Sequence, residues 1–461
     1  MSLINESASI ADLPVAIIGA GPIGLAAASH LASRREPFVV IETGRGPATS
    51  VMAWGHVPLF TPWRYNVDPV ATALLEATGW EAPDPIAHPT GDELVERYLQ
   101  PLALHPDIGP HVRYGRRVRA ITRDTLGKLD EERDDHAFVI EAVDPSGHER
   151  SIRARAVIDA SGSWNTPNPL GANGRIAPGE VELAERIFYG IPDVAGTDRS
   201  RYAGKRTLVV GSGHSAFHSL QHLAALAQEH PGTRVLWALR RGTAFDATAG
   251  CAGDELTERT LLRRDVDVLL REATIDAFPG TRLTHLEPGP DGIVAVAGDR
   301  PLPPVDEIIV ATGFRPDHGL ARELRLDVHS VFESTYALAP LIDPTVSACG
   351  TVPPHGVVQL AHPEPDYYVV GIKSYGRAPT FLLLTGYEQV RSVVCALTGD
   401  ESALTTELDL PDKGLCSACT AFRENREREA ACGCDDDSPG DDCCAAPAGE
   451  HTREPQGVAA D

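Results

Sequence analysis

The chain has 461 residues and a formal net charge of −24 at pH 7. Its length predicts more than one hydrophobic core, and its acidity excludes nucleic acid and anionic membranes as expected partners, because both favour basic surfaces. Apolar residues make up 42% of the chain and charged residues 23%. With no signal-peptide pattern at the start and no apolar run of membrane-spanning length, this composition predicts a globular protein of the cytoplasm.

A short apolar run at residues 15–18 is followed by a glycine-rich turn and an alanine-rich helical pattern. Gly19 allows a sharp turn, Gly21 lets a pyrophosphate approach the backbone, and Gly24 lets the helix pack against the strand. With Pro22 and Ile23 between them, these glycines predict a dinucleotide-binding turn.

The next predicted strand, at residues 37–41, ends in an acid, Glu42. A carboxylate at this position accepts hydrogen bonds from the ribose hydroxyls of an adenine dinucleotide. The strand, the turn, the helix and the acid together predict dinucleotide binding, whereas the glycine spacing alone is a weak signal.

Residues 51–80 are rich in aromatic and proline residues and resemble a loop, in which residues 63–66 either wall a substrate pocket or simply pack. A helical pattern follows at 92–104, and strands are expected at 118–121 and 137–142 on either side of a polar turn. A further strand at 155–160 runs into Ser161 and Gly162. Residues 163–203 contain many prolines and glycines, which is typical of a connection between domains.

The opening pattern returns at residues 207–210, a strand that leads into a turn of G-x-G-x-x-A form and a helix over 216–229. The turn consists of Gly211, Gly213, His214, Ser215 and Ala216. His214 and His218 also have the spacing of a helical metal pair, but their place at the nucleotide turn favours packing and capping.

The strand that follows, at residues 234–239, ends in Arg240 and Arg241 rather than in an acid. Arginines at this position bind the 2′-phosphate of NADP through charge-assisted hydrogen bonds, whereas an acid repels it. The pair therefore favours NADPH over NADH; the alternative is that both arginines face solvent.

Near the end of the chain, a buried strand at 307–311 ends at Thr312 and Gly313, and another strand at 367–371 precedes an amphipathic helix at about 380–397. Beyond Asp400 the chain is acidic, rich in cysteine and poor in large apolar residues. This tail is expected to be disordered unless something binds its thiols.

This order of motifs resembles the flavoproteins with two dinucleotide-binding domains, namely the flavin-containing monooxygenases and their disulfide-reductase relatives. The resemblance covers about residues 13–400. It implies an α/β fold with two Rossmann-like (three-layer ββα) domains, the NADPH domain inserted into the FAD domain. The expected divisions are residues 13–170 and 306–400 for the FAD domain, 200–305 for the NADPH domain, and 401–461 for the tail.

In that superfamily the first glycine turn, with its acid, holds FAD and the second holds NADPH. The run from Ala311 to Asp317 is similar to the family's "ATG" motif, with a second copy at residues 160–162. The N-terminus of the helix at 380–397 points at the flavin in these proteins, and its dipole stabilises negative charge on the reduced ring. The resemblance thus adds to the cofactor site the residues Val118, Ala160, Gly162, Thr312, Gly313, Gly371 and Thr380. It adds to the catalytic candidates the residues Asn66, Lys373, Tyr375 and Arg377.

No cysteine precedes Cys251, so the redox pair that disulfide reductases carry after the first unit has no counterpart. The resemblance then implies O2 as the outlet for electrons, with a C4a-hydroperoxyflavin that oxygenates a small soft nucleophile. The C-terminal half, with its thiol-rich end, also resembles flavin monooxygenases encoded with arsenic-resistance genes in some bacteria. An oligomer is compatible with all of this.

The tail carries six of the nine cysteines. They either lie in a plain disordered segment, bind a metal or trivalent arsenic through thiolates, or shuttle electrons. Two further functions therefore stay open, a disulfide or metalloid reductase that uses the tail and a non-catalytic flavoprotein redox sensor. The candidate ligands are Cys416, Cys419, Cys432, Cys434, Cys443 and Cys444.

Overall fold

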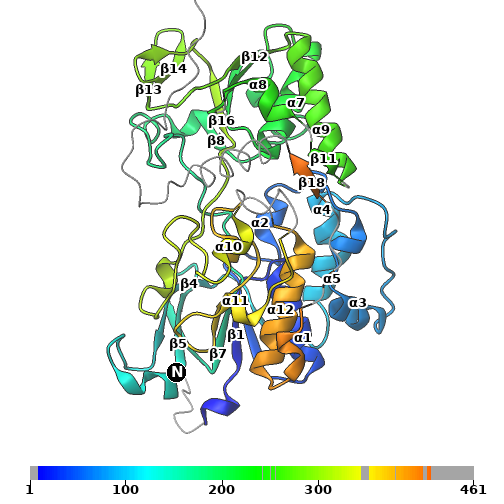
Figure 1. Ribbon diagram of the computed structural model, residues 1–461, viewed down its shortest axis with the longest axis vertical. Helices are drawn as coiled ribbons and strands as arrows, with labels where there is room; N and C mark the ends of the chain where they lie inside the picture. The colour runs from blue at the N-terminus through cyan, green and yellow to red at the C-terminus, as the bar shows by residue number, and fades with distance from the viewer. Residues whose placement is uncertain are drawn as a thin grey trace, which may run out of the picture.

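The computed structural model describes residues 9–240, 242–249, 251–254, 256–343, 352–378, 381–406, 408 and 413–416. Two α/β domains lie one above the other (Figure 1), each built on a five-stranded parallel sheet. The first sheet has the strand order β17-β7-β1-β2-β3 and the second the order β12-β10-β9-β16-β8. This confirms the predicted α/β fold with two Rossmann-like units.

The first sheet is covered on both faces, which is why its central strand β1 is apolar throughout. Helices α1 and α12 pack on one face, and the antiparallel sheet β4-β5-β6 packs on the other. Alternate residues of β1 serve the two layers: Val15 and Ile17 face the helices, whereas Ala16 and Ile18 face the second sheet. The strands are β1 (Val15–Ile18), β2 (Phe38–Ile41), β3 (Val112–Arg113), β4 (Arg117–Arg123), β5 (Phe138–Val143), β6 (Glu149–Ala154), β7 (Ala156–Asp159) and β17 (Tyr367–Val369).

The helices of this domain include α1 (Pro22–Ser33), α2 (Thr49–Met52), α3 (Pro69–Glu76), α10 (Ala339–Ile342), α11 (Val357–Leu360) and α12 (Leu383–Leu397). The helix expected at 92–104 is present as α4 (Gly91–Leu94), a π-helical turn (Val95–Leu99) and α5 (Gln100–Ala103). Thr90 and Glu93 form a capping box at its start, which fixes where it begins.

The second domain repeats the layers. Helices α7 (His214–Glu229) and α9 (Thr257–Arg271) cover one face of its sheet, and the antiparallel strands β13, β14 and β15 cover the other. Short helices α6 (Arg199–Tyr202) and α8 (Ala244–Thr248) also contribute residues to its core. The strands are β8 (Ile187–Tyr189), β9 (Arg206–Val210), β10 (Arg234–Ala238), β12 (Ile275–Phe278), β13 (His285–Gly289), β14 (Gly292–Ala297), β15 (Arg300–Pro301) and β16 (Glu307–Val310).

The expected domain limits of 200 and 305 are wrong at both ends. Strand β8 lies inside the presumed connection, and β16 lies past the expected end, yet β16 pairs with both β8 and β9. Sheet membership is a matter of long-range pairing, which local composition does not report. The second domain therefore extends at least from Ile187 to Val310.

The end of the chain departs from expectation in two ways. Helix α12 begins at Leu383 rather than at 380, and the first domain continues past residue 400 through a 3₁₀ turn (Glu401–Leu404), whose Ala403 carbonyl accepts a hydrogen bond from Ser392. Further on, β18 (Lys413–Cys416) pairs antiparallel with β11 (Cys251–Asp254). No helix in the described ranges is long and apolar enough to cross a membrane.

Candidate cofactor-binding site

The first glycine turn joins β1 to α1, and the chain itself dictates two of its glycines. Gly19 has φ +101°, and a Cβ there would lie 2.7 Å from the carbonyl oxygen of Ala160; a Cβ on Gly24 would lie 2.0 Å from the carbonyl oxygen of Gly19. A Cβ on Gly21, by contrast, would meet nothing within 4 Å. Gly21 is therefore not required by packing, and it leaves open the position where a pyrophosphate approaches.

Gly21 is also the N-cap residue of α1, with Pro22 at the first helical position and no side-chain cap. The first turn of a helix has backbone N–H groups without helical partners, and the helix dipole places partial positive charge there. The uncapped N-terminus of α1 can therefore bind a phosphate. Ile23, the next residue, is buried and would contact a Cβ on Gly371 at 3.1 Å.

Glu42 follows β2 and points back to this turn. Its carboxylate accepts hydrogen bonds from the backbone N–H of Ala20, at 2.7 Å, and from that of Gly44, at 2.6 Å. Burial and the charge of Glu42 raise the pKa of the neighbouring Tyr114 phenol. The acid is thus fixed beside the glycine turn, where a ribose hydroxyl can reach it.

The second turn, between β9 and α7, has the same construction. Gly211 has φ +131°, and a Cβ there would lie 2.3 Å from the carbonyl oxygen of Ala311, whereas a Cβ on Gly213 would meet nothing within 4 Å. Gly213 caps α7 without a side-chain cap hydrogen bond, and Ala216 is buried in the helix face. The indole N–H of Trp237 donates to the Gly211 carbonyl at 2.6 Å and holds the turn.

His214 and Ser215 begin α7, and the imidazole of His214 packs edge-on against Phe60 of the first domain with ring centroids 5.0 Å apart. Burial and the charges of Arg263 and Arg259 lower the pKa of His214 to about 3, so the ring is neutral near pH 7. His218, one turn on, stacks on the same Phe60 ring. These contacts agree with the predicted packing role of the two histidines, and no cluster of metal ligands occurs among the described side chains.

Arg240 follows β10 and its side chain is exposed at the carboxyl end of the second sheet. A cation at this place is in position to meet a ribose phosphate. Arg241 lies outside the described residues.

Strands β7 and β16, which pair with β1 and β9, are each followed by a further glycine turn. Ala160 donates its N–H to the Ile18 carbonyl, and Gly162 has φ +71° with open space around a Cβ. In the second domain, the hydroxyl of Thr312 donates to the Asn168 carbonyl at 2.9 Å, and Gly313 has φ +85°. Both turns of the predicted "ATG" type therefore lie beside a dinucleotide turn.

Lys373, expected near a flavin ring, is part of a buried ion pair. Its Nζ lies 2.7 Å from Asp159 Oδ2 and 3.0 Å from Ser161 Oγ. Tyr367 also donates to the Asp159 carboxylate, at 3.0 Å. Burial alone would raise the pKa of Asp159, but the charge of Lys373 and the hydrogen bonds from Lys373 and Ser161 outweigh it and hold that pKa below its usual value.

Asn66 is buried, and its side-chain amide serves its own loop. The amide donates to the carbonyls of Thr61 and Pro62 and accepts from the Thr61 hydroxyl at 2.7 Å. Its backbone carbonyl accepts from Tyr387 Oη of α12. Because the oxygen and the nitrogen of the amide both form hydrogen bonds within this loop, the side chain stabilises the loop and does not point at a substrate.

The remaining candidates are spread around α12. Gly371 has φ +72° and donates its N–H to Gln389; Tyr375 is fully buried, and burial raises the pKa of its phenol. Arg377 forms an ion pair with Glu333 at 2.8 Å on the surface. Val118 sits half-buried in β4 beside a register shift, packed against the layer that carries β1. Thr380 lies outside the described residues.

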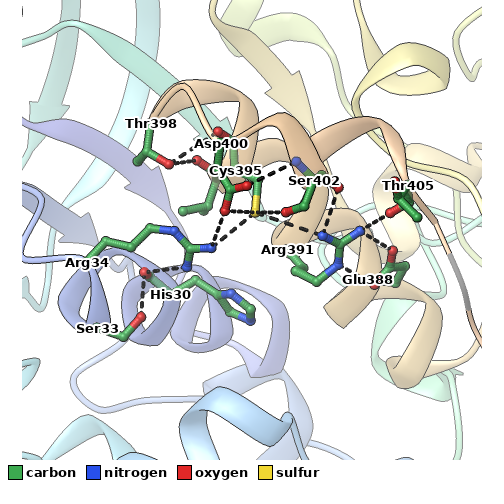
Figure 2. A network of polar contacts seen from close by, with 11 residues as sticks. His30, Ser33, Arg34, Glu388, Arg391, Cys395, Thr398, Asp400, Ser402 and Thr405 are labelled. Carbon is green, nitrogen blue, oxygen red and sulfur yellow. Dashed lines mark hydrogen bonds and ion pairs between the residues drawn. The ribbon is translucent and has the colours of Figure 1, made fainter.

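Among the tail cysteines, Cys419, Cys432, Cys434, Cys443 and Cys444 lie outside the described residues. The backbone register places Cys416 opposite Cys251. Cys395, whose side chain is buried and free of a disulfide, lies in a polar network at the far end of α12 (Figure 2). Its Sγ accepts from Arg34 at 3.1 Å and lies 3.4 Å from Asp400 Oδ2.

Sequence reasoning missed Asp159 and Phe60. Asp159 ends β7 directly before a small-residue turn, and an acid at such a strand end is a signal that the sequence offered. Phe60, which joins the two domains, had no signal beyond its aromatic neighbourhood, because its partners on α7 are far away in the sequence.

The fit of two uncapped glycine turns, each beside a strand-end residue of the required charge, agrees with one dinucleotide in each domain. Residues 13–363 match the family model of the pyridine nucleotide-disulphide oxidoreductases. The chain belongs to this family. It is therefore an oxidoreductase whose family implies FAD and a nicotinamide cofactor.

Solved structures share this fold at low sequence identity. The bacillithiol disulfide reductase Bdr (YpdA) from Bacillus cereus aligns with a TM-score of 0.60 and 17% identity, covering 84% of this chain and 99% of that one. A flavin-containing monooxygenase from Stenotrophomonas maltophilia gives 0.53 and 20%, covering 84% and 98%. The cadaverine monooxygenase DfoA from Erwinia amylovora gives 0.58 and 15%, covering 88% and 100%. A search of the curated proteins finds no match.

Proposed function

We propose that the protein is an NADPH-dependent FAD monooxygenase that uses O2 to oxygenate a small soft nucleophile, such as an amine, a sulfide or an arsenical. The observation that carries the proposal is the place of Cys395. This thiol lies beside Arg34, which follows the C-terminal end of α1, whereas the dinucleotide turn lies at the N-terminal end of the same helix. A helix of 12 residues separates its two ends by about 18 Å.

A disulfide reductase of this fold needs a thiol pair against the flavin. The first 250 residues contain no cysteine, and Cys395 lies in the last turn of α12, at the opposite end of that helix from the N-terminus that would face the flavin. A reduced flavin in the first domain would therefore pass its electrons to an acceptor outside the chain, and O2 is the simplest such acceptor. The likeness to two monooxygenases, one of them named for cadaverine, is compatible with this outlet.

In this proposal, FAD supplies the two-electron and oxygen chemistry when bound. The chain supplies binding and orientation. The N-termini of α1 and α7 hold the two pyrophosphates, Glu42 holds a ribose in the first domain, and Arg240 favours NADPH in the second. The Asp159–Lys373 pair fixes the end of β7 beside the flavin turn.

The proposal is tested by measuring oxygen uptake with NADPH across amines, sulfides, ketones and arsenicals. A substrate should stimulate uptake, and its product should contain one atom from isotopically labelled O2. NADPH oxidation that requires a disulfide and proceeds equally well without O2 would contradict the monooxygenase reading.

A second candidate, a reductase that works through the tail, is favoured by one observation. The antiparallel register of β11 and β18 places residue 251 opposite residue 416, and both are cysteines. Opposed residues in such a pair have Cα atoms about 4.5–5.5 Å apart, a span that a disulfide can bridge.

This candidate predicts anaerobic NADPH oxidation with a low-molecular-weight disulfide as acceptor. Substitution Cys251→Ser should abolish that activity, whereas the matched control Cys395→Ser should keep it. Equal rates for the two variants and the unmodified protein would remove the cysteine pair from the reaction.

A further inference from the structure

Leu59 and Phe60 are consecutive residues, yet they pack against the cores of different domains. Leu59 packs against the helical side of the first domain's core, whereas Phe60 packs against the core of the second domain. The loop itself belongs to the first domain, where the Leu59 N–H donates to the Pro89 carbonyl at 2.8 Å. Phe60 is therefore a side chain of the first domain that completes part of the second domain's core.

The partners of Phe60 lie at the start of α7, beside the second glycine turn. Its ring packs edge-on against His214, with ring centroids 5.0 Å apart, and stacks on His218, with centroids 5.6 Å apart and an interplanar angle of 21°. His214 is the first residue of α7 and directly follows Gly213, the N-cap position where a pyrophosphate can approach. The contact thus holds the nucleotide turn of the second domain against the first domain.

The loop that carries Phe60 is fixed in the first domain. The hydroxyl of Thr61, the next residue, donates to Asn66 Oδ1 at 2.7 Å, and Asn66 Nδ2 donates to the Thr61 carbonyl at 2.7 Å. The Asn66 carbonyl accepts a hydrogen bond from Tyr387 Oη of α12 at 2.8 Å. Because α12 covers the first sheet, these buried contacts tie the position of the Phe60 ring to the frame of that domain.

The chain crosses between the domains twice, before Leu170 of the second core and again after β16. The two crossing segments pair through a bridge between Pro167 and Phe314, and Trp164 stacks on Phe314 with ring centroids 4.7 Å apart. Domains joined in this way move relative to one another unless a further apolar interface holds them. Phe60 belongs to neither crossing segment, so it supplies a separate contact that opposes rotation about the crossing.

The interface next to Phe60 is not closely packed. A cavity of about 220 Å³ lies beside the ring and is lined by both domains, with Leu59 and His88 from the first and Gln221 and Leu262 from the second. Such a space is several times the volume of a water molecule, about 30 Å³. The neighbouring side chains therefore leave much of this part of the domain contact to the phenyl ring.

We propose that Phe60 is a positioning residue for electron transfer from NADPH to the flavin, an inference that rests on the proposed function. In that step a hydride passes from NADPH, which becomes NADP⁺, to the oxidised flavin, which gains two electrons. The reacting atoms must lie about 3–3.5 Å apart, and a displacement of about 1 Å can cost about 100-fold in rate. The two cofactors are assigned to different domains, so Phe60 acts on the rate by fixing how the domains are placed.

The first test separates nucleotide binding from electron transfer. In Phe60→Ala, reduction of the flavin by saturating NADPH without O2 should be at least about tenfold slower than in the unmodified protein. The Kd of NADP⁺, measured by calorimetry on the full chain, should change by no more than about twofold, because the second glycine turn and Arg240 are intact. A weakened Kd with an unchanged limiting rate would overturn the proposal.

Two further variants distinguish positioning from a general loss of packing. Phe60→Tyr keeps the ring and should restore most of the rate. The matched control is Phe245→Ala, because Phe245 is 48% exposed and its ring lies against Arg271 within the second domain; its rate should be unchanged. Circular dichroism and the FAD content show that each variant is folded and loaded. Equal losses in Phe60→Ala and Phe245→Ala, or no recovery in Phe60→Tyr, would contradict the proposed role.

A second readout does not use the reaction. Burial, with smaller effects of neighbouring charges, lowers the pKa of His214 to about 3 and that of His218 to about 4. In Phe60→Ala, water reaches both rings, and nuclear magnetic resonance of labelled histidines at pH 6 should show partial protonation that the unmodified protein lacks. Neutral rings in both proteins would overturn the proposal. If NADPH does not reduce the flavin of the unmodified protein, the proposed function fails, whereas this measurement still decides the domain contact.

Discussion

The ammonium group of Lys373 lies 2.7 Å from the carboxylate of Asp159, and the two side chains are 1% and 0% exposed. Asp159 ends β7, and Lys373 follows β17 after the whole second domain has intervened. The pair therefore joins the two sequence segments of the first domain across its sheet, where β7 and β17 are neighbours.

Substitution Lys373→Met should destabilise the protein by about 3–5 kcal/mol, because it leaves a buried carboxylate without its partner. Urea unfolding measures the loss. The double variant Lys373→Met with Asp159→Asn should recover part of it. As a control, Arg271→Met breaks an exposed pair with Asp267 and should cost less than about 1 kcal/mol. A similar small loss in Lys373→Met would show that the pair is not a structural element.

The same pair gives a pH dependence. The pKa of Asp159 is lowered in the folded protein, so its stabilising contribution is fully present above the unfolded value, about 3.9, and is lost as the pH falls through the folded value. Unfolding curves below pH 4 should therefore show a loss that Asp159→Asn reduces.

The two kinds of glycine in the first turn can be separated by alanine. Gly24→Ala should destabilise the fold by about 1–3 kcal/mol, because the new Cβ meets a backbone oxygen that cannot move freely. Gly21→Ala meets no neighbour and should leave the unfolding free energy within about 0.5 kcal/mol, while the purified protein contains less FAD. Thermal unfolding and the flavin absorbance measure the two effects. Normal FAD content in Gly21→Ala would exclude this turn as the flavin site.

The buried histidines predict acid sensitivity. Because the pKa of His218 is lowered to about 4 in the folded state, unfolding takes up a proton between about pH 6.5 and 4, and stability falls as the pH falls through this range. At pH 5 the loss from this residue is about 2 kcal/mol. Urea unfolding at pH 7.5 and 5 should show a smaller difference in His218→Phe. His148→Gln, at an exposed histidine, should keep the full difference.

Arg240→Ala tests the choice of nicotinamide cofactor. If this arginine binds the 2′-phosphate, the substitution should raise the KM for NADPH about tenfold and leave that for NADH unchanged, because one charge-assisted contact is lost. Steady-state kinetics with both cofactors make the comparison. An equal increase for both would assign the residue a structural role.

The sequence predicted the dinucleotide turns well, since the turn is a local strand–turn–helix unit in which Gly24 packs against the carbonyl of Gly19. The predictions that depend on distant residues fared differently. Strand β8 has only three residues and pairs at the edge of its sheet, so its own sequence carries little signal. The partner of Lys373 is 214 positions away, and nothing near Lys373 in the sequence indicates an acid.

Asn66 is a residue for which the sequence suggested a role that the structure does not support. Its residue type and place suggested chemistry, but an amide can equally well close a loop, and only the positions of Thr61 and Pro62 decide between the two. Domain limits failed for a related reason, because β16 looks like any buried strand until its neighbours are known.

The insertion also has a consequence for synthesis on the ribosome. A nascent chain that has emerged through Val310 holds every strand of the second sheet, whereas the first sheet still lacks β17 and the covering helix α12. Domains fold as units when their residues are available. The second domain therefore completes its core first, and Asp159 stays without its cation until Lys373 has been translated, which makes completion of the first domain one of the last steps in folding.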